Sequence, residues 1–192
     1  MKLPRTKIWE AAATDKERPT LTNVHYNVEK KRLEAADGFI LAVCPVEPDN
    51  KDKGGIVPVD VIKGAMKAST RKGKVPTMTE TVEGFIAGVA NNGTESIVGN
   101  SYLPVEGQFP DVDAITPKGE PEYVMTIDAE LLYRLAMAIC EDKSGGNKPL
   151  LHVRLYKYSH TSPIRVEPGP QRLNRENWGL IMPISDGEKQ GH

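Results

Sequence analysis

The sequence is poor in cysteine, carries almost no net charge and lacks any long hydrophobic run. No apolar stretch approaches the roughly 18 residues that a membrane-spanning helix needs, and none follows the opening residues 1–5, so we predict no signal peptide and a cytoplasmic protein. Cys44 and Cys140 lie among apolar residues, which predicts reduced, buried thiols rather than a disulfide or a nucleophile. The formal net charge of −1 excludes a general attraction to nucleic acid, so any DNA contact must come from a local patch.

Signals for catalysis and metal binding are also missing. No two of the histidines have the spacing of metal ligands; they are His25, His152, His160 and His192. There is no glycine-rich phosphate loop after a strand and no nucleophile elbow. Asp111 and Asp113 flank a turn, where such residues cap or bend the backbone. We therefore expect no metal, no cofactor and no enzymatic activity, with an enzyme on a diverged scaffold left open as an alternative.

Hydrophobic spacing and turn residues predict a mixture of strands and helices. Asp37-Gly38 predicts a hairpin turn between strands at 32–36 and 39–46. Asp60 and Asp128 are the predicted N-caps of two helices. One face of the second helix carries Leu131, Leu132, Leu135, Ala136 and Ile139. The other expected elements are a short helix over 6–14 and strands over 24–28, 56–59, 77–99 (broken at Gly84 and at 91–93), 123–126, 150–156, 164–166 and 179–184.

A pattern of short strand, helix and several strands recurs along the chain. Residues 57–62 and 125–131 open two such units alike, and the N-terminal helix with the strands up to Val46 forms a third. The proline- and glycine-containing stretch 116–121 is the best candidate for a linker. Recurrence of one supersecondary unit predicts an architecture built by stacking that unit.

Three short phrases occur in a characteristic order: Ala-Asp-Gly-Phe-Ile-Leu-Ala-Val at 36–43, Leu-Pro-Val-Glu-Gly-Gln-Phe-Pro-Asp at 103–111, and Gly-Leu-Ile-Met-Pro-Ile at 179–184. Together they resemble the sliding clamp family, the beta subunit of bacterial DNA polymerase III. The resemblance implies an α+β fold of the DNA-clamp type, in which repeated strand-helix-strands units place antiparallel sheets outside and helices on one face. It also implies a clamp-like domain over 1–118, similar to the second clamp domain, a half domain over 119–185, similar to the second half of the third, and a tail over 186–192.

The chain departs from the family in ways that matter for assembly. The first clamp domain and the first half of the third have no counterpart, and Phe39-Ile40 replaces the family's His-Arg. Such a chain cannot close the ordinary ring of two protomers, so we expect a homo-oligomer with the 123–184 unit at an interface. The implied function is a non-catalytic processivity or scaffold role in DNA replication or repair. The alternative is a peptide-binding adaptor or regulator of the replication machinery that does not encircle DNA.

Basic residues cluster on and after the central helix. In clamps, helices line the hole and their basic side chains face DNA phosphates without reading the sequence. The resemblance therefore implies non-specific contact with duplex DNA by this cluster, although an ordinary solvated helix face has the same pattern. Its members are Lys63, Lys67, Arg71, Lys72 and Lys74.

The resemblance also implies an apolar groove that binds peptide motifs of polymerases or repair proteins. Clamp grooves are lined by the segment around the Asp-Gly turn, by the domain exit and by the closing Met-Pro strand. The alternative is that these residues are ordinary core residues of strands. The matching residues here are Tyr26, Phe39, Ile40, Leu41, Pro110, Ile115, Met182, Pro183 and Ile184.

Overall fold

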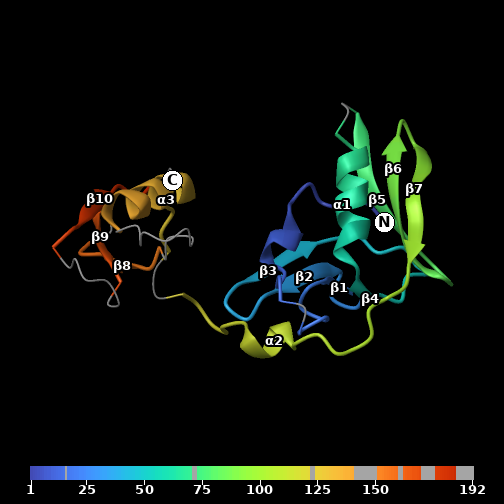
Figure 1. Ribbon diagram of the computed structural model, residues 1–192, viewed down its shortest axis with the longest axis horizontal. Coiled ribbons are helices and arrows are strands. Elements are labelled where there is room, and N and C mark those ends of the chain that lie inside the picture. Colours follow the sequence, from blue (N-terminus) through green and yellow to red (C-terminus); the bar gives the residue numbers. More distant parts are fainter. Residues whose placement is uncertain are drawn as a thin grey trace, which may run out of the picture. The chain divides into compact units, whose positions relative to one another are not determined.

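The computed structural model describes residues 1–15, 17–70, 73–121, 124–140, 151–159, 162–169 and 176–184. The chain divides into two compact units, Met1–Pro117 (unit 1) and Lys118–His192 (unit 2), shown in Figure 1. The division falls inside the stretch 116–121, which the sequence marks as a linker. The predicted tail over 186–192 lies outside the described residues.

Unit 1 contains two antiparallel sheets, and helix α1 (Val59–Ala68) packs against the second of them (Figure 1). The first sheet has the strand order β3-β2-β1-β4, and the second has the order β5-β6-β7. The strands are β1 (Val24–Asn27), β2 (Arg32–Ala36), β3 (Leu41–Pro45), β4 (Gly55–Val57), β5 (Lys74–Thr81), β6 (Gly84–Asn91) and β7 (Thr94–Tyr102).

The two halves of unit 1 exchange their first strands. The N-terminal half runs from Lys2 through the 3-10 helix η1 (Ile8–Ala11) to β3, and the second half runs from β4 through α1 to β7. Strand β4 pairs with β1 of the N-terminal half, so that Ile56 lies opposite His25. In return, Lys2 lies opposite Thr77 of β5. The two halves therefore repeat the same order of segments, but in the N-terminal half the helix is a single 3-10 turn and the first strand is one isolated bridge.

The halves also share one hydrophobic core. Val61, Ile62 and Ala65 of α1 belong to the same buried cluster as Leu3 and Ile8 of the N-terminal half. Full burial of a large aliphatic side chain contributes about 1.5–3 kcal/mol. A core drawn from both halves therefore couples their folding.

The hairpin between β2 and β3 follows from local sequence. The side chain of Asp37 accepts hydrogen bonds from the backbone N–H groups of Phe39 and Ile40, at 2.8 and 2.9 Å. Gly38 has a φ of 96°, which favours glycine. The predicted turn is confirmed, but the strand begins at Leu41 rather than Phe39 because Asp37 holds the intervening amides in the turn.

The long strand region predicted over 77–99 breaks where expected. Its second break is the two-residue turn Asn92-Gly93, with φ values of 48° and 82°. Positive φ at both central residues is what a type I′ hairpin turn requires. The first break lies at Gly84, where β6 begins.

The helix predicted over 6–14 is wrong in extent. Only the single turn η1 forms, because Ala12 is already extended, with a ψ of 148°. The N–H of Ala13 then donates to the carbonyl of Leu21 at 2.8 Å. A bond to a residue further along the chain replaces the next helical turn.

The start of α1 also differs from the prediction. Asp60 is not the N-cap, because the helix begins at Val59, directly after Pro58. The N–H of Val59 donates to the side chain of Asn23 at 3.1 Å. Asn23, a residue of the N-terminal half, therefore caps the start of α1 in place of a neighbouring residue. Local sequence does not reveal this contact.

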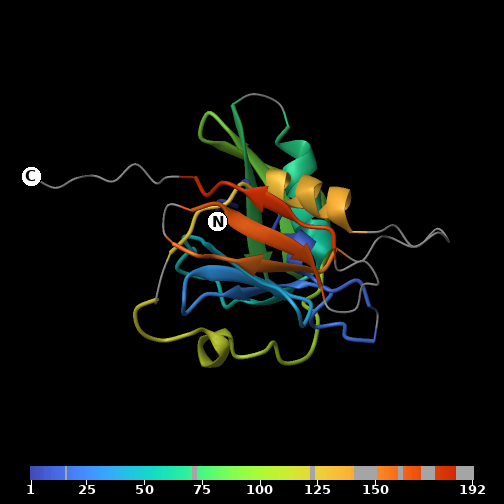
Figure 2. The same cartoon turned by 90° about the vertical axis from the view of Figure 1, so that its left-hand side faces the viewer.

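Unit 2 is a three-stranded antiparallel sheet with helix α3 (Ala129–Ile139) packed against it. The strand order is β10-β9-β8, with β8 (Val153–Tyr156), β9 (Ile164–Pro168) and β10 (Gly179–Ile181). In both views α3 lies against β9 and β10 (Figures 1 and 2). The predicted cap is confirmed, since the Asp128 side chain accepts hydrogen bonds from the N–H groups of Glu130 and Leu131.

The buried face of α3 is narrower than predicted. Ala136 and Ile139 are buried, and Leu132 and Leu135 pack against the core, but Leu131 is 46% exposed. The buried core of unit 2 is correspondingly small and comes from α3, β9 and β10; it comprises Ile139, Cys140, Ile164, Val166 and Ile181.

The predicted α+β fold class is confirmed, because antiparallel sheets carry helices packed against them in both units. Both cysteines are free thiols, as predicted. Cys140 is buried, whereas Cys44 on β3 is only half-buried, so the prediction of burial is correct for Cys140 alone.

Candidate nucleic-acid interface

The exposed side of α1 carries Lys63 and Lys67. They are four residues apart, so they lie one above the other on the helix surface, away from the buried Val61 and Ile62. Among the described residues neither lysine takes part in a salt bridge. Two such ammonium groups on one helix face are suited to phosphate contacts that do not depend on base sequence.

A third basic group reaches this helix from the N-terminal half. The exposed guanidinium of Arg5 donates to the carbonyl of Ser69, the C-cap of α1, at 3.4 Å, and to the carbonyl of Lys74. Lys74 itself is half-buried at the start of β5. Arg71 and Lys72, which the sequence analysis assigned to the same patch, lie outside the described residues. Local sequence does not place Arg5 beside α1, because the strand pairing that brings it there joins residues far apart in the chain.

Helix α3 does not repeat the basic face. Counted from the start of each helix, Tyr133 and Met137 hold the positions that Lys63 and Lys67 hold in α1. They are 57% and 44% exposed, so this surface of unit 2 is apolar. The basic cluster on a helix face is therefore a property of unit 1.

The predicted groove residues of unit 1 lie mostly on its surface. Phe39 at the β2–β3 turn is 94% exposed, Ile40 is 53% exposed and Leu41 is 37% exposed. Ile115 is 62% exposed, and Pro110 is also exposed. Large apolar side chains are normally buried, so a turn that exposes three of them in succession is unusual.

Tyr26 differs from the other predicted groove residues. It is 1% exposed and belongs to the core of unit 1. Its hydroxyl donates to Asp52 at 2.6 Å, and burial, followed by this hydrogen bond, raises the pKa of the phenol. A side chain this enclosed offers no surface to a peptide.

The predicted groove residues of unit 2 follow β10. Met182 and Ile184 are 60% and 50% exposed, and Pro183 is half-buried. Ile184 also forms an isolated β-bridge with Thr126. The N–H of Ile184 donates to the carbonyl of Thr126 at 2.9 Å.

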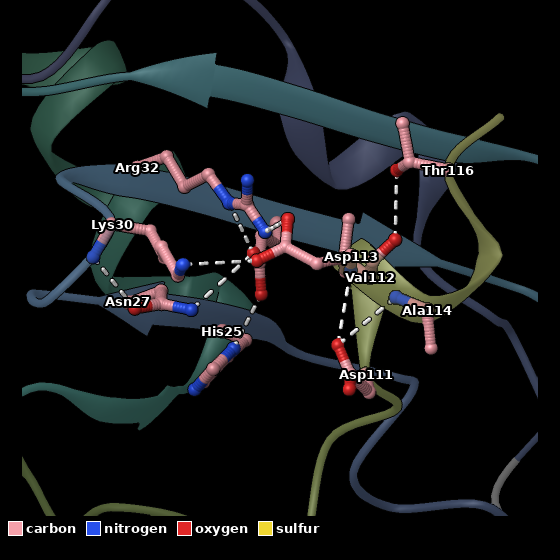
Figure 3. Close-up of polar contacts among 10 residues, drawn as sticks. His25, Asn27, Lys30, Arg32, Asp111, Val112, Asp113, Ala114 and Thr116 are labelled. Atoms are coloured by element: carbon pink, nitrogen blue, oxygen red, sulfur yellow. Dashed lines mark hydrogen bonds and ion pairs between the residues drawn. The ribbon is translucent and has the colours of Figure 1, made fainter. Parts of the chain in front are cut away.

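A buried charged network on the first sheet was not foreseen from sequence. Glu34 is 1% exposed, and its carboxylate contacts Nδ1 of His25 at 2.6 Å and Nε of Arg32 at 2.5 Å. Arg32 also donates to Asp113 at 2.8 Å, and Lys30 lies 3.3 Å from the same carboxylate (Figure 3). Arg32 and Glu34 are two residues apart on one strand, so their side chains lie on the same side of the sheet, and this spacing was the local signal for their contact.

This network fastens the exit segment of unit 1 to the sheet. The short helix α2 (Val112–Ile115) is capped by Asp111, whose side chain accepts from the N–H groups of Asp113 and Ala114 (Figure 3). Phe109, just before it, is buried and stacks on His25 with ring centroids 5.0 Å apart. The predicted capping role is confirmed for Asp111, whereas Asp113 pairs with basic side chains.

The pairing also affects the acidity of Asp113. The hydrogen bond from Arg32, and then that from Lys30, hold the pKa of this carboxyl below its usual range. A carboxylate with a lowered pKa in the folded state contributes stability above its ordinary pKa and loses it as the pH falls through the folded-state value. The attachment of α2 is therefore complete at neutral pH and weakens only in acid.

Within the described residues, no group of three or more histidine, cysteine, aspartate or glutamate side chains is arranged to hold a metal ion. None of the helices in the same residues has the length and apolar character needed to cross a membrane.

Comparison with known proteins gives similarity to solved structures alone. No protein-family model matches the chain, and no curated protein matches it significantly. The DNA polymerase III beta chain of Streptococcus pneumoniae TIGR4 is similar at 16% identity and a TM-score of 0.46, over 93% of this chain and 60% of that one. The beta subunit of Thermotoga maritima gives 18% identity and a TM-score of 0.43, over 93% and 61%. The sliding clamp of Pseudomonas aeruginosa gives 15% identity and a TM-score of 0.48, over 96% and 66%.

The chain thus spans 60–66% of the length of these three proteins. At identities of 15–18%, the similarity concerns the fold alone.

Proposed function

We propose that this chain is a non-catalytic, clamp-like protein that contacts the phosphate backbone of duplex DNA and acts as a processivity factor or scaffold in DNA replication or repair. The observation that carries the proposal is the exposed basic side of α1, with Lys63 and Lys67 on the helix and Arg5 at its end. The ordered sequence phrases at 36–43, 103–111 and 179–184 support it independently.

The charge distribution favours weak, sequence-independent binding. The chain has a net charge of −1, so the attraction comes from a local patch rather than from the whole molecule. Lysine and arginine that neutralise phosphates release counterions, and the affinity then falls with salt. A protein that moves along DNA needs contacts of this kind, because they carry no sequence information.

We expect the affinity for a short fluorescein-labelled duplex of arbitrary sequence to depend steeply on salt. If two to four phosphates are contacted, affinity should fall roughly 10- to 150-fold between about 50 and 200 mM salt. Replacing both Lys63 and Lys67 with glutamate should abolish binding at the lower salt. The melting temperature should change little, since solvated charges contribute little to stability. Fluorescence anisotropy and thermal unfolding measure the two quantities.

The matched control reverses two other lysines. Lys51→Glu with Lys53→Glu alters the net charge equally, at exposed residues of the loop between β3 and β4. This variant should keep most of the affinity if the α1 surface is the contact. Equal losses in both double variants would show that net charge alone governs binding. No binding by the unaltered protein at low salt would overturn the proposal.

A second candidate function, a peptide-binding adaptor of the replication machinery, is favoured by the open apolar turn of unit 1. Phe39, Ile40 and Leu41 follow one another there, and Ile115 is also exposed. Met182 and Ile184 add exposed apolar side chains in unit 2. Apolar surfaces of this kind bind short extended peptides through a few buried anchors, and the flexible thioether of methionine adapts to different anchors.

We expect the protein to select hydrophobic members from a library of short synthetic peptides. Because Phe39-Ile40 replaces the family's polar pair, the usual clamp-binding motif should bind weakly. Leu41→Ala should weaken binding of a peptide that docks on unit 1, and Met182→Ala should weaken binding of a peptide that docks on unit 2, as measured by isothermal titration calorimetry. Val82→Ala, at a fully exposed residue between β5 and β6, is the control. Unchanged affinity in both test variants would rule out these residues as the docking surface.

A further inference from the structure

We infer that unit 2 forms a twofold-symmetric dimer with unit 2 of a second copy of this chain, in which the strand segment before α3 of each copy pairs with β8 of the other. The inference rests on unit 1, which shows within one chain how two such halves combine. It does not depend on DNA or peptide binding.

Unit 2 matches the second half of unit 1 in register at both ends. In unit 1, Ile56 lies three residues before α1 and bridges Val105, three residues after β7. In unit 2, Thr126 lies three residues before α3 and bridges Ile184, three residues after β10. The sequences agree as well, because Leu-Pro-Val at 103–105 corresponds to Met-Pro-Ile at 182–184.

The strand pairs of the two sheets, β6 with β7 and β9 with β10, have corresponding residues opposite each other. Phe85 pairs with Tyr102 at the end of β7, and Ile164 pairs with Ile181 at the end of β10. Phe85 and Ile164 are both 0% exposed, so corresponding positions form the centre of each core. Unit 2 is therefore equivalent to one half of unit 1.

Burial differs sharply between corresponding residues. Val61, the third residue of α1, is 0% exposed, whereas Leu131, the third residue of α3, is 46% exposed. Met78 pairs with Ala87, two residues after Phe85, and is 1% exposed. Leu155 has the corresponding place opposite Val166, and it is 43% exposed.

These differences in burial arise because the described part of unit 2 has no second half packed against it. In unit 1, residues of the N-terminal half such as Leu3 and Ile8 complete the core that contains Val61 and Met78. The described part of unit 2 contains one half only, and β8 is the edge of its sheet. An exposed edge beside exposed apolar side chains is a surface ready to pair.

A second copy of unit 2 fits this surface. In unit 1 each half lends its first strand to the sheet of the other, and the two exchanged pairs are equivalent: Lys2 opposite Thr77, and Ile56 opposite His25. Because the exchange is reciprocal, two identical halves complete each other at once, which is an isologous interface. By the same register, Thr126 of one copy lies opposite Arg154 of the second copy.

This pair is suited to disulfide trapping. The N–H of Leu3 donates to the carbonyl of Pro76, and the N–H of Met78 donates to the carbonyl of Met1, so Lys2 and Thr77 form a non-hydrogen-bonded pair. Such pairs have Cα atoms about 4.5 Å apart, within the range that a disulfide spans. Within one copy, β9 and β10 separate β8 from the strand position of Thr126, so a bond inside one chain cannot form.

The experiment uses the full chain with Cys44→Ser and Cys140→Ser. Adding Thr126→Cys and Arg154→Cys together should give a disulfide-linked dimer under mild oxidation, seen on a non-reducing gel. Thr126→Cys alone and Arg154→Cys alone should remain unlinked, because the twofold axis places each opposite the other and not opposite itself. Absence of the linked dimer from the double-cysteine variant would overturn the proposed pairing.

The mass in solution provides the second measurement. Light scattering at micromolar concentration should give a dimer for the unaltered chain and a monomer for Leu131→Glu with Leu155→Glu. Circular dichroism should be unchanged, because both residues are already exposed in the single chain. Val82→Glu, at a fully exposed residue between β5 and β6, should remain a dimer. A monomeric unaltered chain, or a dimer undisturbed by the two glutamates, would contradict the inference, whereas a dimer that fails to bind DNA would overturn only the proposed function.

Discussion

Replacing Arg32 with methionine should destabilise unit 1 by about 1–3 kcal/mol, because it removes a hydrogen-bond donor from the buried carboxylate of Glu34. The variant leaves the carboxylate of Glu34, at 1% exposure, with His25 and a distant amide of Asn27 at 3.5 Å. It also removes the link from β2 to Asp113 that holds α2 against the sheet. Urea unfolding followed by circular dichroism measures the loss.

Two comparisons separate the buried charge from other effects of the substitution. Arg18→Met removes an exposed guanidinium that pairs with Asp15 and donates to the carbonyl of Asp37. Arg18 and Asp15 are both about half exposed, so the expected loss is about 1 kcal/mol or less. Combining Arg32→Met with Glu34→Leu should recover much of the loss, since replacing a whole buried pair with apolar residues is often nearly neutral. If Arg32→Met is as stable as Arg18→Met, the network is not a determinant of the fold.

Truncating the central core residue of either unit should destabilise that unit selectively. Phe85→Ala should cost about 3–5 kcal/mol and Ile164→Ala about 2–5 kcal/mol, the ranges typical of large-to-small changes in a packed core. Both side chains are 0% exposed and occupy corresponding positions in their sheets.

Hydrogen exchange read by mass spectrometry shows where each loss occurs. Phe85→Ala should raise exchange throughout unit 1, in β1 to β7 and α1, because both halves share the core that contains Phe85, and Ile164→Ala should raise it in α3 and β8 to β10. Val82→Ala, at a fully exposed residue, should leave both regions unchanged. Increased exchange throughout the chain in either test variant would show that the units do not unfold as separate bodies.

The proposed DNA contact and the dimer concern different surfaces. The basic side of α1 and the apolar turn at Phe39 belong to unit 1, whereas Leu131 and Leu155 belong to unit 2. A dimer through unit 2 would bring two copies of the α1 surface into one assembly, and paired weak contacts gain affinity through their high effective concentration. The Leu131→Glu with Leu155→Glu variant would then weaken DNA binding without touching a basic residue.

Sequence by itself determined the local features of this protein. The turn at Asp37, the break at residues 91–93 and the cap at Asp128 depend on side chains that act on nearby backbone groups. The recurrence of one strand-helix-strands unit could also be predicted, because it repeats a hydrophobic pattern and short phrases. The α+β class follows from these elements, and the exposed lysines of α1 follow from helical spacing.

The tertiary structure alone decided which side chains are buried and which distant residues they contact. The contact of Asn23 with the start of α1, the contact of Arg5 with its end, and the burial of Tyr26 depend on segments paired across the two halves. The contact of Arg32 with Asp113 likewise joins residues far apart in the chain. The contrast between Leu131 and its buried counterpart in α1 has the same origin, since both carry the helical pattern of a core residue. A hydrophobic period specifies which side of a helix seeks burial, but whether that side is covered depends on a partner surface that lies far away in sequence or in another chain.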